Sequence, residues 1–172
     1  MKLMILSFVM LRIEQSKVFK TQLINLRCTR LTTSDVECAA IFLHSSSHKT
    51  WKELQLSYCY IQNHGLTILH RRLRQSDITI VELSLDSNEL TKLSSPLVSE
   101  ITIHCKVKQL KINGNSTIGE DERLFLILTD PSSVLKVLSM NHIKLSQATT
   151  TNLFVALKDN NTLKKLIVFI SR

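Results

Sequence analysis

One pattern of apolar residues recurs along most of this sequence at a nearly constant spacing. It reads as an apolar residue, two others, Leu, one other, an apolar residue, two others, Asn or Cys, one other, and Leu or Ile; the clearest copy runs from Trp51 to Ile61. The Leu position of successive copies is occupied by Ile24, Leu54, Leu83, Leu110, Leu138 and Leu166, so the steps are 30, 29, 27, 28 and 28 residues. A fixed period of this size predicts a chain of similar units stacked one behind another.

Each copy changes from the period of a strand to the period of a helix. In WKELQLSYCYIQNHGLTILHRRL, residues 51–73, Leu54 and Leu56 are two apart, whereas Leu66, Leu69 and Leu73 are three and four apart. Alternate residues share one face of a strand, and residues three or four apart share one face of a helix. We therefore predict strand, turn and helix in each copy, with the apolar sides of neighbouring copies buried against each other.

The Asn or Cys position lies where the chain leaves the predicted strand. Side chains at Asn88 and Asn115 can satisfy backbone groups of the turn there, Cys59 can do so more weakly, and Ile143 cannot.

Start signals are visible for several of the predicted helices. Ser34 with Glu37 predicts a capping box, and Ser146 is a candidate cap for the last helix. Pro96 after Ser95 predicts a short helix ending near Ile103. This helix belongs to the third copy, which contains Leu83, and we expect that copy to be the least regular.

Composition limits the classes of protein that the chain can belong to. The 172 residues, 44% of them hydrophobic, suffice for one domain, which we divide into an apolar N-terminal segment, 1–19, and a domain of five to six repeats, 20–172. The net charge of +8 is spread along the chain and aromatic residues make up 5%, which does not favour a specific nucleic-acid partner. Four cysteines without a CxxC pair favour reduced thiols in a cytosolic protein.

The spacing and the residues above resemble the leucine-rich repeats of the ribonuclease-inhibitor type. LTTSDVECAAIFL and WKELQLSYCYIQNHGLTIL are similar to the repeat region of NOD-like receptors, the innate-immunity sensors. The resemblance implies an α/β fold, a right-handed solenoid forming a horseshoe segment, with a parallel sheet on the concave side and helices on the convex side.

Alternate strand residues should face the concave side, where binding or catalytic side chains would lie. The expected protein-binding residues are Glu53, Gln55, Ser57, Glu82, Ser84, Asp86, Lys111, Asn113, Ser139, Asn141 and Lys165. None is His or Cys, so neither a Ser-His-Asp nor a Cys-His arrangement can form on this face, and we predict a protein that is not an enzyme. No cofactor or metal is expected, because GNSTIG lacks the Lys of a phosphate loop and no carboxylate or Cys completes a site with His44 and His48.

An extended polar face suits a protein or peptide ligand better than a small molecule. Acidic groups come first along it and lysines later, so a ligand with the opposite order of charge would be oriented. The resemblance implies a ligand-sensing or autoinhibitory, cytoplasmic repeat region without a membrane span. The alternatives are a ribonuclease-inhibitor-like or GTPase-regulating scaffold, and a secreted receptor ectodomain in which Met1 to Ser16 is a cleaved signal rather than a buried edge segment.

Overall fold

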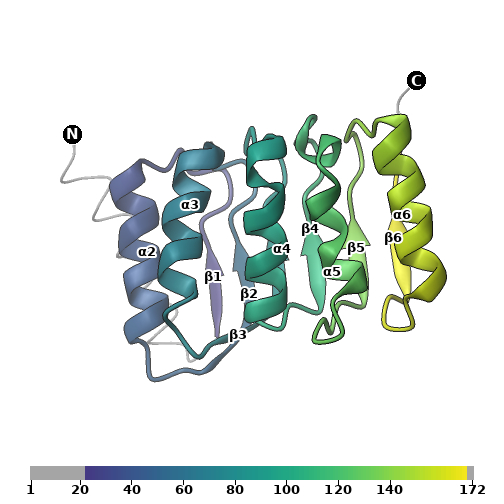
Figure 1. Ribbon diagram of the computed structural model, residues 1–172. Helices are drawn as coiled ribbons and strands as arrows, with labels where there is room; N and C mark the ends of the chain where they lie inside the picture. Colours follow the sequence, from purple (N-terminus) through teal and green to yellow (C-terminus); the bar gives the residue numbers. More distant parts are fainter. Residues whose placement is uncertain (1–21, 170–172) are drawn as a thin grey trace.

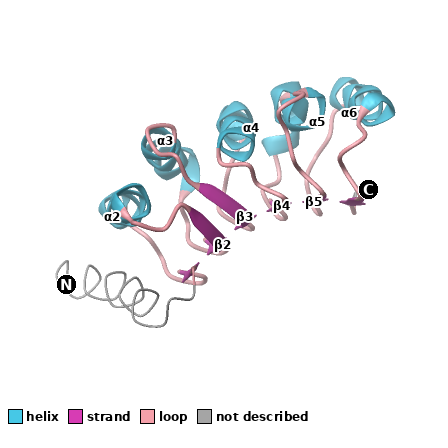
Figure 2. Cartoon of the chain, turned by 90° about the horizontal axis from the view of Figure 1, so that it is seen from below, coloured by secondary structure: helices cyan, strands magenta, loops and turns pink. Residues whose placement is uncertain are grey.

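The structure, a computed structural model that describes residues 22–169, is an α/β fold with two layers (Figure 1). Six parallel strands form one sheet in chain order. They are β1 (Leu23–Asn25), β2 (Thr50–Gln55), β3 (Thr79–Ser84), β4 (Gln109–Lys111), β5 (Val137–Ser139) and β6 (Lys165–Ile167). The α-helices in this part of the chain are α2 (Thr33–Ser45), α3 (Gln62–Leu73), α4 (Ser95–His104), α5 (Leu126–Thr129) and α6 (Gln147–Asp159). They all lie on one side of the sheet (Figure 2).

The predicted alignment of the repeated leucines is confirmed. Leu54 of β2 is in register with Ile24 on one side and Leu83 on the other, and the row continues through Leu110, Leu138 and Leu166. The first five residues of this row are buried beneath the helices, and Leu166 at the last strand is half-buried. Stacking of these side chains supplies the core that one strand and one helix could not form alone. The segment 1–19, including the interpretation of Met1 to Ser16, lies outside the described residues.

The predicted role of the two asparagines is also confirmed. Asn88 is fully buried; its Oδ1 accepts hydrogen bonds from the N–H groups of Cys59 and Ile61, at 3.0 and 3.3 Å, in the preceding turn. Its Nδ2 donates to the carbonyl of Leu56 at 2.7 Å. Asn115 repeats this arrangement one step further along the chain. Each amide therefore joins two neighbouring turns and satisfies backbone groups at a position that water does not reach.

The first predicted helix cap is wrong by two residues. Thr32, rather than Ser34, precedes α2, and its Oγ1 accepts from the N–H of Asp35 at 3.3 Å while the Asp35 carboxylate accepts from the N–H of Thr32 at 2.8 Å. The backbone is still extended at Thr32, so the helix starts immediately after it and Ser34 already lies in the first turn. Ser146 caps α6, as predicted.

The irregular segment follows β4, not β3. Pro96 lies in the first turn of α4, and that helix ends at His104, close to the predicted end. After β4 the chain instead forms 3₁₀ turns at Ile118–Glu120 and Glu122–Phe125 before the four-residue α5. Ser99 of α4 donates its hydroxyl to the carbonyls of Arg123 and Leu124. These bonds hold the two carbonyls against α4. The least regular helical segment therefore follows β4, and the prediction of greatest irregularity in the third copy, which contains Leu83, is wrong.

Candidate protein-binding surface

The sheet has one face that the helices do not cover, which we call the open sheet face (Figure 2). The predicted binding residues of the strands lie in two rows across it, together with Gln109, Val137 and Ile167, and the parallel register fixes these rows. One row contains Glu53, Glu82, Gln109, Val137 and Lys165, and the other contains Gln55, Ser84, Lys111, Ser139 and Ile167. The structure therefore brings these strand residues onto a single surface.

The prediction that three serines of this face are accessible to a ligand is wrong. Ser57, Ser84 and Ser139 are only 3%, 1% and 6% exposed. Ser84 is in register between Gln55 and Lys111, so its short side chain lies between two longer ones that shield it. A ligand on this face would contact the longer side chains around the serines.

Charges on the open sheet face partly neutralise each other. The Nζ of Lys111 forms an ion pair and hydrogen bond with the carboxylate of Glu82, and Gln55 donates to the carboxylate of Glu53. The predicted order of charge is present, with acidic groups before lysines along the sheet. Its two central groups, Glu82 on β3 and Lys111 on β4, neutralise each other in the ion pair. The charged group most available to a ligand is Lys165, which is exposed on β6.

Asp86 and Asn113 connect the turns that follow β3 and β4. The Asp86 carboxylate accepts from both the N–H and the Nδ2 of Asn113 at 2.8 Å. The Oδ1 of Asn113 accepts in turn from the Ser139 hydroxyl at 2.8 Å and the Asn141 N–H at 2.7 Å. Because these polar groups are engaged with each other, Asp86 and Asn113 fix the edge of the surface.

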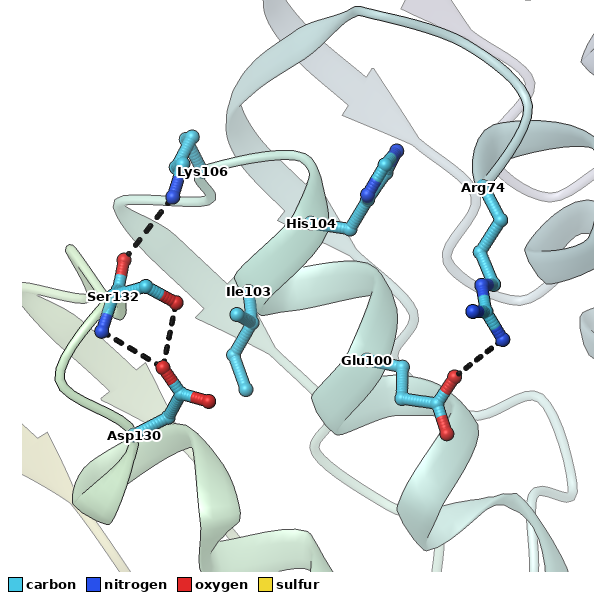
Figure 3. Close-up of a pocket in the computed structure, with 7 residues that line it drawn as sticks. All are labelled: Arg74, Glu100, Ile103, His104, Lys106, Asp130 and Ser132. Atoms are coloured by element: carbon cyan, nitrogen blue, oxygen red, sulfur yellow. Dashed lines mark hydrogen bonds and ion pairs between the residues drawn. The ribbon is translucent and has the colours of Figure 1, made fainter.

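An open depression of about 570 Å³ lies elsewhere, at the ends of α3 and α4, and it contains a serine, a histidine and an aspartate (Figure 3). Ser132 donates its hydroxyl to Asp130, not to His104, whose Nε2 lies 3.0 Å from the carbonyl of Ser76. The ring of His104 points away from Ser132 and Asp130 (Figure 3). A nucleophile needs a hydrogen-bonded base, and no described hydrogen bond joins His104 to Ser132.

The basic sequence His70 to Gln75 is paired with carboxylates. Arg72 donates to Glu37 at 2.7 Å, and Glu100 lies 2.8 Å from His70 and 3.5 Å from Arg74. The hydrogen bond from Arg72 lowers the pKa of Glu37 below its ordinary value. These contacts compensate much of the local positive charge that a nucleic-acid backbone would need.

Among residues 22–169, no group of three His, Cys, Asp or Glu side chains could hold a metal ion. The ring of His48 packs edge-on against Trp51, with centroids 5.8 Å apart. None of the helices in this range has the length and apolar character needed to cross a bilayer.

Sequence reasoning missed one group of surface residues, at the turns after β1 and β2. Arg27 lies over the ring of Tyr58 and Arg30 over the ring of Tyr60. The signal available in the sequence was the pair of tyrosines on either side of Cys59, two large side chains that cannot both point into the core with it.

All four cysteines are free, and their environments predict different reactivity. Burial raises the pKa of Cys59 to about 11 and that of Cys105 to about 12, whereas Cys28 is exposed and Cys38 half-buried. At pH 8 we expect iodoacetamide to label Cys28 and Cys38 at least about tenfold faster than the two buried thiols, because the thiolate is the reactive form. Peptide mass spectrometry of the native protein measures this; equal rates at all four would contradict the burial, and denatured protein provides the fully labelled reference.

No protein-family model matches the sequence, and no curated protein matches it either. The function is therefore inferred from the sequence pattern and from the geometry of the open sheet face.

Proposed function

We propose that this protein is a leucine-rich-repeat protein of the ribonuclease-inhibitor type that binds another protein or peptide without catalysing a reaction. In this proposal the stacked units form a right-handed solenoid, and the open sheet face is its concave side. The aligned row of buried leucines and the buried asparagines at Asn88 and Asn115 support the assignment. The resemblance to NOD-like receptors extends it to a cytoplasmic sensing or autoinhibitory region, an inference by analogy of fold.

The observation that carries the proposal is the extended polar sheet face left uncovered by the helices (Figure 2). Two rows of side chains cross all the strands in register, and they offer a broad surface with spaced hydrogen-bonding groups. Such a surface matches the size of a protein interface better than that of a small molecule, which needs an enclosing pocket.

Charge reversal at two positions tests the open sheet face. Glu53→Lys with Lys165→Glu leaves the net charge unchanged but inverts the outer charges of one row. Misplaced like charges weaken a specific complex, so we expect affinity capture from a cell extract to recover at least one protein about tenfold less well with this variant.

The matched control is Glu120→Lys with Lys158→Glu, which exchanges the same charges at exposed positions outside the strands. Recovery with the control should equal that of the unsubstituted protein, and circular dichroism should show the same fold for all three. If every captured protein is recovered equally by the two variants, the open sheet face is not the binding surface.

A further inference from the structure

The turns after β1 to β5 each contain a left-handed backbone position, and the turn after β2 has tyrosine at two left-handed positions. Equivalent positions are Cys28, Tyr58, Ser87, Gly114 and His142, with φ between 51° and 69°. Tyr60, two residues on, is left-handed as well, with φ of 58°. This conformation suits glycine, which stands at Gly114, and is unfavourable for a large aromatic residue. The occurrence of two tyrosines at such strained positions of one turn indicates a role for their side chains.

These tyrosines are exposed, and an arginine side chain packs over the ring of each. Tyr58 is 52% exposed and Tyr60 41% exposed. The guanidinium carbon of Arg27 lies 5.6 Å from the ring centroid of Tyr58, and that of Arg30 lies 4.9 Å from that of Tyr60. We call these four residues the Arg-Tyr rim. Stacking holds each guanidinium in place over a ring while its N–H groups remain accessible to a partner.

Neither arginine of the rim has a carboxylate partner among residues 22–169. The preceding part of the sequence does not supply an excess of acid, because residues 1–21 contain Glu14 as their single acidic residue against Lys2, Arg12, Lys17 and Lys20. The rim thus differs from the arginines of α3, which are paired with Glu37 and Glu100. Its positive charge is uncompensated within this part of the protein.

We propose that the Arg-Tyr rim is a second docking site that binds an acidic segment of a partner protein. The guanidinium fork matches the geometry of a carboxylate, and two such groups select a segment with two acidic side chains. Arginine and tyrosine, with tryptophan, are enriched among the residues that dominate the binding energy of protein interfaces, because they combine apolar area with directed hydrogen bonds. Stacking also orders the arginines before binding, which reduces the entropy lost in the complex.

A protein segment fits this site better than a nucleic acid does. Single-stranded nucleic acids bind aromatic residues by stacking bases on a free ring face. At the Arg-Tyr rim one face of each ring is already covered by a guanidinium. The site lies at the turns after β1 and β2, so it is independent of the open sheet face and of the proposal made for that face.

A peptide titration tests the site directly. The probe is a fluorescein-labelled peptide of alternating glutamate and glycine, and its control has glutamine in place of every glutamate. In fluorescence anisotropy with the full chain, we expect the glutamate peptide to bind saturably and the Arg27→Gln, Arg30→Gln variant to raise its Kd at least about fivefold. The glutamine peptide should bind at least about fivefold more weakly than the glutamate peptide.

The matched variant is Lys49→Gln with Lys158→Gln, which removes the same charge from exposed positions elsewhere. It should change the Kd less than about twofold, since general attraction to a basic protein is shared by many groups. The Glu53→Lys, Lys165→Glu variant should bind the peptide normally, which separates this proposal from that for the open sheet face.

Three results would overturn the proposal. The first is no saturable binding of the glutamate peptide up to about 1 mM. The second is an equal loss of affinity in the rim variant and the lysine variant. The third is tighter, rim-dependent binding of a labelled oligouridylate than of the peptide, which would assign the rim to single-stranded nucleic acid.

Discussion

Replacing Leu83 with alanine should lower the free energy of unfolding by about 3–5 kcal/mol. Leu83 is fully buried at the centre of the apolar row, in register with Leu54 on one side and Leu110 on the other. Both neighbouring strands are held in place by their own leucines and by the sheet hydrogen bonds, so the cavity left by the missing atoms cannot collapse. The loss therefore includes the transfer energy of the side chain and the energy of a persistent cavity.

Chemical denaturation followed by circular dichroism measures this loss, and Trp51, the single tryptophan, provides a fluorescence signal from the adjacent strand. Leu93→Ala is the matched control, because Leu93 is 68% exposed and the same substitution there should change the free energy of unfolding by less than about 0.5 kcal/mol. Equal effects of the two substitutions would mean that the row of leucines is not the core.

Much of the architecture could be predicted because it depends on apolar residues at a fixed spacing. The step of 27 to 30 residues places each leucine beside the next, and the parallel register of Leu54, Leu83 and Leu110 follows from that spacing alone. The asparagines could be predicted for a similar reason. A polar side chain at the end of a buried strand must find backbone partners, and the turn provides them.

The position of the first helix cap could not be derived from residue types. TTSDVE contains two candidates, Thr32 with Asp35 and Ser34 with Glu37, and both satisfy the pattern of a capping box. The N–H of Leu31 donates to the carbonyl of Cys59 at 2.9 Å, so contact with the next turn keeps the chain extended up to Leu31. The helix therefore begins at the first cap available after that contact.

The candidate surface was predictable in outline and not in its accessible groups. Alternation along the strands assigns side chains to the open sheet face, but exposure depends on the neighbours across the sheet. Ser84 is buried because the register places it between Gln55 and Lys111, and Glu82 is partly neutralised because Lys111 reaches it from β4. The Arg-Tyr rim was missed because its contacts join residues about thirty positions apart across two turns.

Asn88→Ala should be about as damaging as the loss of a core leucine, with an expected decrease of about 3–5 kcal/mol in the free energy of unfolding. The side chain bonds two N–H groups and the carbonyls of Leu56 and Asp86, all from a fully buried position. Alanine removes the amide but leaves these backbone groups away from water. Each buried group left unpaired costs about 1–3 kcal/mol, which outweighs the modest net value of an ordinary hydrogen bond.

Asn161→Ala provides the control, since Asn161 is exposed in the loop that follows α6 and should tolerate alanine within about 0.5 kcal/mol. The turn at Ile143 shows how a copy without the amide is connected, because there the N–H of Lys144 donates directly to the carbonyl of Ser116 at 2.7 Å. The residues that correspond to Ser116 and Lys144 in the turns joined by Asn88 are Tyr60 and Glu89. Both have a left-handed backbone, whereas Ser116 and Lys144 do not. We therefore expect no backbone rescue in Asn88→Ala. Denaturation that shows a loss below about 1 kcal/mol would mean that the turns are held together without the asparagine.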